Sequence, residues 1–309
     1  MSVAPAIAEL AAALGARARP NESLARHTTL RIGGPADLWI EAHTLVELVE
    51  SVTRARERAI PVFILGNGSN LLVLDGGIRG LVIENHCNQF RLNVTNDKQA
   101  ILRVESGAAL PLIANQLARQ GWSGLEWAVG VPGTVGGAVA GNAGAHAGCI
   151  ADRLLTVSIL DEAGQVIELP KTDLGFEYRQ SRLKHSRGEI VLGADFEMTR
   201  DDPQACIARM NQYTEHRRRT QPTEASVGSM FKNPPGDYAG RLIEQAGLKG
   251  TRVGNVEVSP VHANFFVNHG GATATDVVQL IEIVKDRVAR KFGVELELEI
   301  EIVGDKAAA

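Results

Sequence analysis

The residues best suited to chemistry lie at positions 228–234, where the chain reads GSMFKNP. Ser229 supplies a hydroxyl, Lys232 a cation and Asn233 an amide within five positions. Glycine and proline disfavour a regular helix, so we predict a shaped loop. Polar side chains on loops held by a rigid scaffold are where chemistry usually takes place. Because Ser229 has no adjacent histidine and lies in no GxSxG elbow, a serine hydrolase is not indicated.

A glycine-rich stretch at residues 130–148 is the second feature that could act on a ligand. It contains Gly130, Gly133, Gly136, Gly137, Gly141, Gly144 and Gly148. Many glycines let backbone amides approach an anion such as a diphosphate. The stretch has neither a Walker loop nor a GxGxxG fingerprint, which removes the two usual nucleotide patterns. Phosphate binding and tight backbone packing explain it equally well.

Residues 65–72, which read LGNGSNLL, offer another amide-rich turn after a predicted strand. A plain strand–turn–strand is the simpler interpretation, and a second phosphate edge is the alternative. Arg217, Arg218 and Arg219 could grip phosphate through forked donors, although a solvated helix end accounts for at least two of them. His262 is interpreted as packed or hydrogen-bonded rather than as a metal ligand, because no second ligand lies at helical spacing.

The composition is that of an ordinary globular protein with room for two or three modest domains in 309 residues. A net charge of -4 gives no reason to expect nucleic-acid binding. Cys87, Cys149 and Cys206 are far apart and form no CxxC, which fits a reducing cytoplasm. No segment is apolar enough to span a membrane, and residues 4–14 are predicted as an amphipathic helix rather than a signal peptide.

The predicted elements position these motifs. We expect strands at 60–65, 71–74, 81–84 and 189–198, hairpins at 90–104 and 154–169, and a helix at 110–120. Strands and helices mix without a steady βαβ rhythm, so the fold class is α+β. A polar helix follows a domain boundary near residue 202, and further helices are expected at 238–246 and around Val277–Val288. Glutamates at 295, 297, 299 and 301 alternate with apolar residues, which predicts the wet face of a half-buried strand.

Two groups of motifs resemble one known family. The first is TLRIGGPA from Thr29, LGNGSNLL from Leu65 and VPGTVGGAVAGNAGAHAG from Val131. The second is YRQS from Tyr178, GSMFKNP from Gly228, LIEQAGLKG from Leu242, HANFFVN from His262 and LELEIEIVG from Leu296. They are similar to the flavin-binding and catalytic halves of the UDP-N-acetylenolpyruvoylglucosamine reductases, flavoenzymes of peptidoglycan precursor synthesis. The resemblance covers residues 28–304 and points to the type II branch.

The resemblance implies an α+β architecture in three parts. A two-part FAD-binding domain of the vanillyl-alcohol-oxidase/PCMH type would occupy residues 1–87 and 88–202, and a separate α+β substrate-binding domain residues 203–309. FAD would bind non-covalently in the two glycine-rich segments. The implied cofactor residues are Gly66, Asn67, Gly68, Ser69, Asn70, Leu71, Gly130, Pro132, Gly133, Thr134, Gly136, Gly137, Asn142, Ala143, Gly144 and Ile190.

By the same resemblance, NADPH reduces FAD and leaves, and UDP-N-acetylglucosamine enolpyruvate then binds in the place that NADPH has left. The resemblance also implies that the protein works in the bacterial cytoplasm. Ser229 matches the proton donor, Arg179 the residue that stabilises the enolate, and Glu299 the carboxyl group that works with it. The implied substrate residues are Tyr178, Lys232, Asn233, Gln245 and Arg219. No metal, nucleic acid or membrane insertion is implied. Two departures are Glu301, where a basic residue is common, and the sequence EASV at 224–227, where the family is more proline-rich.

Two rival interpretations stay open. An alcohol oxidase of the same broad flavin fold would need a larger substrate domain and often a covalent flavin link. Flavin that stays attached after heating in acid would favour it. A non-catalytic module that binds a nucleotide sugar would purify as a colourless protein, whereas the reductase would be yellow.

Overall fold

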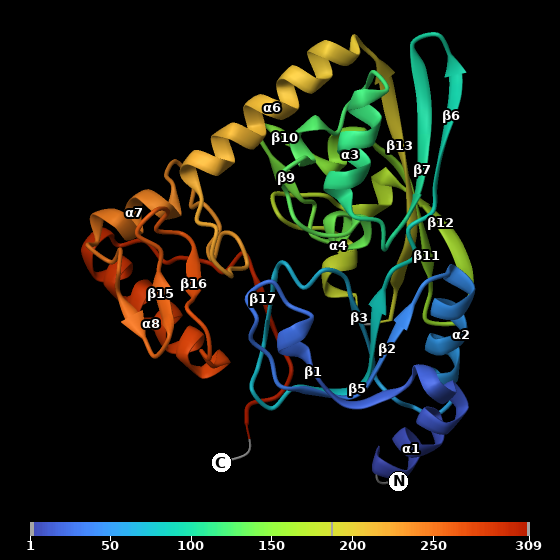
Figure 1. Ribbon diagram of the computed structural model, residues 1–309, viewed down its shortest axis with the longest axis horizontal. Coiled ribbons are helices and arrows are strands. Elements are labelled where there is room, and N and C mark those ends of the chain that lie inside the picture. Colours follow the sequence, from blue (N-terminus) through green and yellow to red (C-terminus); the bar gives the residue numbers. More distant parts are fainter. Residues whose placement is uncertain (1–2, 187, 308–309) are drawn as a thin grey trace.

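The computed structural model describes residues 3–186 and 188–307, which form three packed parts (Figure 1). The first is a four-stranded sheet in the order β1-β2-β5-β3. Its strands are β1 (Arg19–Ser23), β2 (Pro35–Ala42), β3 (Val62–Leu65) and β5 (Ile78–Asn85). Helices α1 (Val3–Leu14) and α2 (Leu45–Arg56) pack on it through a shared apolar core. The predicted strands at 60–65 and 81–84 and the N-terminal helix are confirmed.

The second part is an antiparallel sheet that carries the glycine-rich stretch. The order β12-β11-β13-β7-β6 joins β6 (Phe90–Asn96), β7 (Gln99–Glu105), β11 (Leu154–Leu160), β12 (Val166–Pro170) and β13 (Ile190–Arg200). Both predicted hairpins and the strand at 189–198 are confirmed. Helices α3 (Leu110–Arg119) and α4 (Val135–Ala140) and the turn η3 (Glu126–Ala128) pack on this sheet around a common core. The helix predicted at 110–120 is therefore also confirmed.

Helix α6 (Pro203–Thr220) packs on α3 and η3 of the second part and leads toward the third part, which includes α7 (Ala239–Gln245) (Figure 1). Asp202 caps α6 by accepting hydrogen bonds from Gln204 N and Ala205 N. The long helix α8 (Ala274–Phe292) begins with a Thr273–Asp276 capping box and ends at Gly293, whose φ of 68° suits a glycine. It packs against a small sheet of β14 (Arg252–Val253), β15 (Val256–Val258) and β16 (Phe266–Asn268).

The third part is fastened to the first by shared strands and a shared core. The C-terminal strand β17 (Glu301–Val303) returns and pairs in parallel with β4 (Leu71–Val73). Leu30, Ile32 and Leu72 belong to the same apolar core as α7 and α8. Asp75 accepts hydrogen bonds from the first backbone amides of α8, Ala274 N at 2.8 Å and Thr275 N at 2.9 Å. These contacts bring residues 229–234 close to the turn at 66–70.

The strand predicted over residues 294–302 is wrong in part, because only Glu301–Val303 forms regular strand. Upstream of it, Leu298 bridges Phe231 and Glu299 N donates to Met230 O at 2.9 Å. The chain bends between this pairing with residues 230–231 and the pairing of β17 with β4, so inward and outward side chains no longer alternate. Glu299 is turned inward with a side chain only 16% exposed, whereas the Glu297 side chain is 76% exposed. No helix in the described ranges is long and apolar enough to cross a membrane.

Candidate active site

The two glycine-rich segments lie against each other. Ser69 Oγ donates to Pro132 O at 3.1 Å. A Cβ on Gly66 would lie 2.5 Å from Thr134 Oγ1, and a Cβ on Gly133 would lie 3.2 Å from Ser69 Oγ. Side chains at these two glycines would therefore push the loops apart. The close approach comes from residues that are more than sixty positions apart in the sequence.

Backbone amides on these loops are free to bind an anion. In the part of the chain that the structure describes, no acceptor is paired with the N–H groups of Asn67, Gly68, Ser69, Asn70, Gly133 and Thr134. Gly68 has a φ of 58°, and its carbonyl accepts from Thr29 N at 3.1 Å, which fixes the turn. Unpaired amides on two facing loops fit the diphosphate of a dinucleotide cofactor such as FAD.

The other implied cofactor residues are used differently. Gly136 N already donates to Ser106 O at 2.8 Å, and Gly137 N makes a long bond of 3.4 Å to Thr134 Oγ1. Ala143 N donates to Ala138 O, Gly144 lies in the short hairpin of β9 (Gly144–Ala145) and β10 (Gly148–Cys149), and Leu71 begins β4. Ile190 begins β13 and packs in the core of the first part. These residues shape the loops rather than offer free donors.

Asn142 links the glycine-rich stretch to the turn that carries Arg179. Its Nδ2 donates to Glu177 O at 2.8 Å, and its Oδ1 accepts from Ala151 N at 3.1 Å. Ser181 Oγ donates to Ala140 O at 2.6 Å on the other side of the turn. Glu177 and Gln180 exchange both backbone hydrogen bonds, so Tyr178 and Arg179 form the tip. Arg179 takes a φ of 58°, an unusual conformation for a residue other than glycine.

Arg179 and Glu299 meet at the junction of the second and third parts. Arg179 Nε donates to Glu299 Oε1 at 2.7 Å, and the side chains are only 23% and 16% exposed. Burial raises the pKa of the Glu299 carboxyl group above its usual range, while the cations of Arg179, Lys184 and Lys232 offset part of that rise. The site therefore holds a carboxyl group that retains its proton more readily than a surface glutamate.

Ser229 lies on the neighbouring segment, as Met230 O accepts the backbone hydrogen bond from Glu299 N. Ser229 is one of the residues that line a pocket of about 390 Å³. The pocket is also lined by Asn233, Tyr238, Gly240, Arg241, Glu244, Val261, His262, Ala263 and Asn264. The segment that carries the Ser229 hydroxyl is therefore hydrogen-bonded directly to the segment that carries Glu299. The Glu299 segment is bonded in turn to the loop at 66–70, through Asn70 Nδ2 and Glu299 O.

The implied substrate residues differ in their surroundings. Tyr178 is 55% exposed and stacks with the Arg179 guanidinium at 5.4 Å. Lys232 Nζ pairs with Glu297 at 3.2 Å, and Asn233 Oδ1 accepts from Ala239 N at 3.1 Å. Gln245 lies at the C-terminal end of α7, where its side chain accepts from Arg241 Nη1 at 2.7 Å. Arg219 is exposed and lies 3.8 Å from Glu215.

Arg217 is a candidate that sequence reasoning did not single out. Its aliphatic stem packs on Gly130, where a Cβ would overlap the Arg217 side chain. Among the described residues its guanidinium has no hydrogen-bonded or ionic partner, and burial lowers its pKa. Arg218 and Arg219 both pair with Glu215, so only Arg217 points toward the glycine-rich loop. The sequence signal that could have indicated Arg217 is Gly130, because a glycine at this position leaves room for the long arginine side chain.

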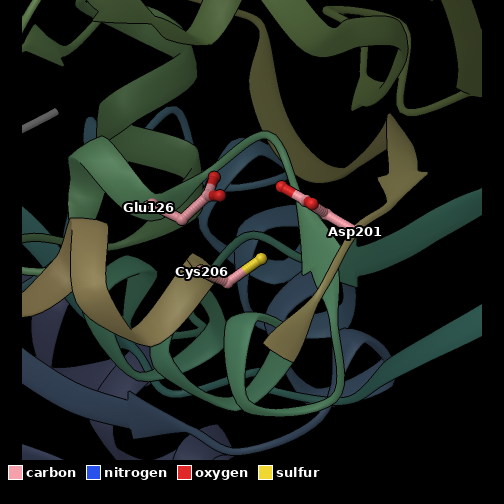
Figure 2. Close-up of side chains that lie close together, drawn as sticks. All are labelled: Glu126, Asp201 and Cys206. Carbon is pink, nitrogen blue, oxygen red and sulfur yellow. The ribbon is translucent and has the colours of Figure 1, made fainter. Parts of the chain in front are cut away.

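A separate cluster resembles a metal site in composition. Glu126, Asp201 and Cys206 place one ligand atom each within 4.8 Å of one another (Figure 2). Arg209 Nη2 donates to Glu126 Oε1 and Asp201 Oδ2, both at 2.6 Å, and reaches Cys206 Sγ at 3.3 Å. Burial and the nearby Glu126 carboxylate raise the pKa of the Cys206 thiol to about 11. An arginine already supplies the positive charge, so the cluster fastens α6 to η3.

The comparisons with known proteins agree with this geometry. Residues 36–170 match an FAD binding domain, and residues 221–303 match the C-terminal domain of UDP-N-acetylenolpyruvoylglucosamine reductase. The reductase of Moorella thermoacetica is 45% identical, covering 96% of this chain and 97% of its own. The reductase of Chloroflexus aggregans is 43% identical, covering 92% and 97%. The crystal structure of the Thermus caldophilus enzyme superposes with a TM-score of 0.79 at 38% identity, covering 92% and 98%.

Fold and site define an FAD-dependent oxidoreductase with an FAD-binding domain and a separate C-terminal α+β domain. The chain belongs to the UDP-N-acetylenolpyruvoylglucosamine reductase family, whose members act in peptidoglycan precursor synthesis. The family, fold class, cofactor and enzyme class predicted from the sequence are confirmed.

Proposed function

We propose that this chain reduces UDP-N-acetylglucosamine enolpyruvate to UDP-N-acetylmuramate with NADPH, in the bacterial cytoplasm. Hydride adds to the terminal vinyl carbon and a proton adds to the adjacent carbon, so one C=C bond is lost and NADPH becomes NADP⁺. Bound FAD would supply the chemistry of hydride transfer from NADPH to the vinyl carbon. The observation that carries the proposal is the meeting of Arg179, Glu299 and the Ser229 segment beside two loops of unpaired amides.

Arg179 and Glu299 stabilise the charge that develops on the substrate. Hydride addition places negative charge on the carbon conjugated to the carboxylate, which forms an enolate. A preorganised guanidinium in a partly buried site stabilises such charge far better than water does. Glu299 contributes only while it carries or shares a proton, because a bare carboxylate would repel the enolate. Its raised pKa supports this assignment.

Ser229 completes the reaction by donating its proton to the enolate carbon. Ser229 lines the pocket, and its Oγ makes no hydrogen bond to any described residue, so the hydroxyl is free to meet a ligand. A positioned acid contributes about a hundred- to ten-thousand-fold in rate. The substrate would bind in this pocket, which Asn233 also lines. Lys232 belongs to the same segment as the serine, and Tyr178 lies beside Arg179 at the tip of its turn.

The free amides of residues 67–70, 133 and 134 would hold the diphosphate of FAD, and Arg217 on α6 would supply a cation beside Gly130. We keep the division into residues 1–87, 88–202 and 203–309, with the first two parts holding FAD and the third the nucleotide sugar. Gln245 and Arg219 lie apart from the Ser229 pocket, so we expect their contribution to substrate binding to be small.

The experiment that tests the proposal is a flavin spectrum followed by a stopped-flow assay. The purified protein should be yellow, should release its flavin on heating in acid, and should be bleached by NADPH. Its colour should return, under anaerobic conditions, on adding UDP-N-acetylglucosamine enolpyruvate. Flavin that stays attached after heating, or reduced flavin that this substrate leaves bleached, would contradict the proposal. A colourless protein that binds the nucleotide sugar would support the binding module instead.

A further inference from the structure

The segment that carries Ser229 has backbone partners on both sides. On one side it pairs with the tail, through Glu299 N to Met230 O and Lys232 N to Glu297 O, both at 2.9 Å. On the other side it meets residues 264 and 265, where Met230 N donates to Asn264 O at 2.7 Å and Ser229 bridges Phe265. Residues 229–232 thus lie between two other extended segments, and this pairing sets the position of Ser229 relative to Glu299.

Next to Met230, the side chain of Asn264 takes the place of a backbone partner for Phe231. Asn264 Oδ1 accepts from Phe231 N at 3.0 Å, and Asn264 Nδ2 donates to Phe231 O at 2.8 Å. The amide therefore satisfies both backbone groups of one residue, as a neighbouring strand would. Asn264 is only 3% exposed, so water cannot substitute for these bonds. Only an asparagine or glutamine carries both a donor and an acceptor in this geometry.

We propose that Asn264 is a positioning residue that sets the place of the Ser229 hydroxyl relative to the Arg179–Glu299 pair. This inference rests on the proposed role of Ser229 as proton donor. Asn264 lines the pocket, but both hydrogen bonds that its amide makes go to the backbone of Phe231, so its effect on Ser229 passes through that backbone. It acts through the backbone of residues 229–231, and a shift of about 1 Å in a reacting group can cost on the order of a hundred-fold in rate.

The same residue also orients His262. Asn264 N donates to His262 Nδ1 at 3.2 Å, which makes Nδ1 an acceptor and leaves the proton of the neutral ring on Nε2. Burial and the nearby Lys249 cation lower the pKa of His262, which favours the neutral ring. His262 lines the Ser229 pocket, and because this bond comes from the backbone, it is kept in every variant of residue 264.

The test compares Asn264→Asp with the matched control Asn268→Asp. Aspartate keeps the size and the acceptor but faces Phe231 O with a second oxygen instead of a donor. Asn268 is another buried asparagine, whose Nδ2 donates to Leu30 O at 2.9 Å away from Ser229. Flavin content and unfolding midpoint are measured first. If Asn264→Asp does not fold, Asn264→Ser, which removes the amide without adding charge, takes its place.

In stopped flow, Asn264→Asp should leave flavin reduction by NADPH within about two-fold of the parent and slow reoxidation by the enolpyruvyl nucleotide by about a hundred-fold. Asn268→Asp should change both half-reactions equally or not at all. The double variant Ser229→Ala with Asn264→Asp should reoxidise no more slowly than Ser229→Ala alone, because Asn264 acts through the serine.

Three outcomes would overturn the inference. These are a normal reoxidation rate in Asn264→Asp, equal slowing of both half-reactions, and full additivity in the double variant. Failure of the proposed function has a different signature. In that case the enolpyruvyl nucleotide would fail to reoxidise the reduced flavin of the parent protein, whereas a parent rate in Ser229→Ala alone would remove only the serine from its role.

Discussion

Arg179 Nε donates to Glu299 Oε1 at 2.7 Å, which joins a turn of the second part to the tail of the third across 120 positions of sequence. The turn is held by Asn142 and Ser181, and the tail is held by its pairing with Met230. Because both partners are fixed by other contacts, the pair can be present before substrate arrives. Removal of Glu299 would leave the partly buried guanidinium of Arg179 without its hydrogen-bond partner, which is costly.

We predict that Glu299, alone among the four tail glutamates, is required for turnover. Glu299→Ala should lose activity, and Glu299→Gln should lose less because it keeps the size and a hydrogen-bond donor. Glu297 and Glu301 pair with Lys232 and Lys184 at 3.2 and 3.8 Å, and Glu295 is exposed. Their glutamine variants should stay within about two-fold of the parent, since exposed pairs contribute little. Steady-state turnover at equal flavin content checks this. Full activity in Glu299→Ala would show that the catalytic carboxyl group is misplaced.

We predict a pH-dependent difference in stability between the parent and Glu299→Gln. Since the folded protein raises the pKa of Glu299 above 4.5, it binds this proton more tightly than the unfolded chain does. That contribution is complete at low pH and is lost as the pH rises through the raised pKa. The free energy of unfolding of the parent, relative to the glutamine variant, should therefore fall from pH 4.5 upward. Urea unfolding at several pH values measures it, and a flat or rising difference would argue against a protonated Glu299.

We predict that Ser229→Ala separates the two half-reactions. The serine acts only after hydride reaches the substrate, so reduction of the flavin by NADPH should persist. Reoxidation by the enolpyruvyl nucleotide should slow by about a hundred- to ten-thousand-fold, the value of a lost general acid. Stopped-flow absorbance of the flavin follows both steps. Equal slowing of the two would remove Ser229 from the role of proton donor.

We predict that the contact between the two glycine-rich loops is needed for flavin binding. A side chain in Gly66→Val would collide with Thr134 and spread the amides that face the cofactor. Losing a hydrogen bond to a charged group costs about 1.5–3 kcal/mol, or roughly ten- to a hundred-fold in affinity. Gly136→Val should also yield protein with little flavin, but by displacing α4, since its Cβ would lie 2.9 Å from Ser106 Cβ.

Gly141→Ala is the matched control for these glycine variants. The new Cβ would lie 3.4 Å from Gly137 O, an ordinary contact, and the φ of -89° suits alanine. It should keep the parent's flavin content. Flavin released by acid and quantified per protein distinguishes the variants. A Gly66→Val protein with full flavin and weakened substrate binding would reassign the loops to the nucleotide sugar.

We predict that Arg217 and Arg219 contribute unequally. Arg217→Met removes an unpaired cation packed on Gly130 and should weaken FAD binding by about ten- to a hundred-fold. Arg219→Met removes an exposed partner of Glu215 and should change it less than two-fold. Reconstitution of flavin-free protein with FAD, followed by fluorescence, gives both affinities. An equal loss in the two variants would return Arg219 to the site.

The sequence determined the local elements and the identity of the chemistry. Periodic apolar residues, caps and turn residues are local signals, so α3, α6, α8 and both hairpins were predictable, as was an α+β chain without a βαβ rhythm. The order of the motifs indicated the family, and the resemblance to the family indicated the roles of Ser229, Arg179 and Glu299. On pattern alone, however, Glu299 was one of four equivalent glutamates and Arg217 one of three equivalent arginines.

Only the tertiary structure separated these equivalents, because burial depends on what packs against a residue rather than on its neighbours in sequence. The pairing with Met230 turned Glu299 inward and interrupted a strand that alternation predicted to be continuous. Gly130 leaves room for Arg217. Residues 66–70 lie against residues 130–136, and this contact assigns the glycines to a site between two loops, where the sequence left tight packing as an equal explanation. Asn264 lies in the HANFFVN motif, but no local pattern shows its role, since its partner lies thirty-three positions away.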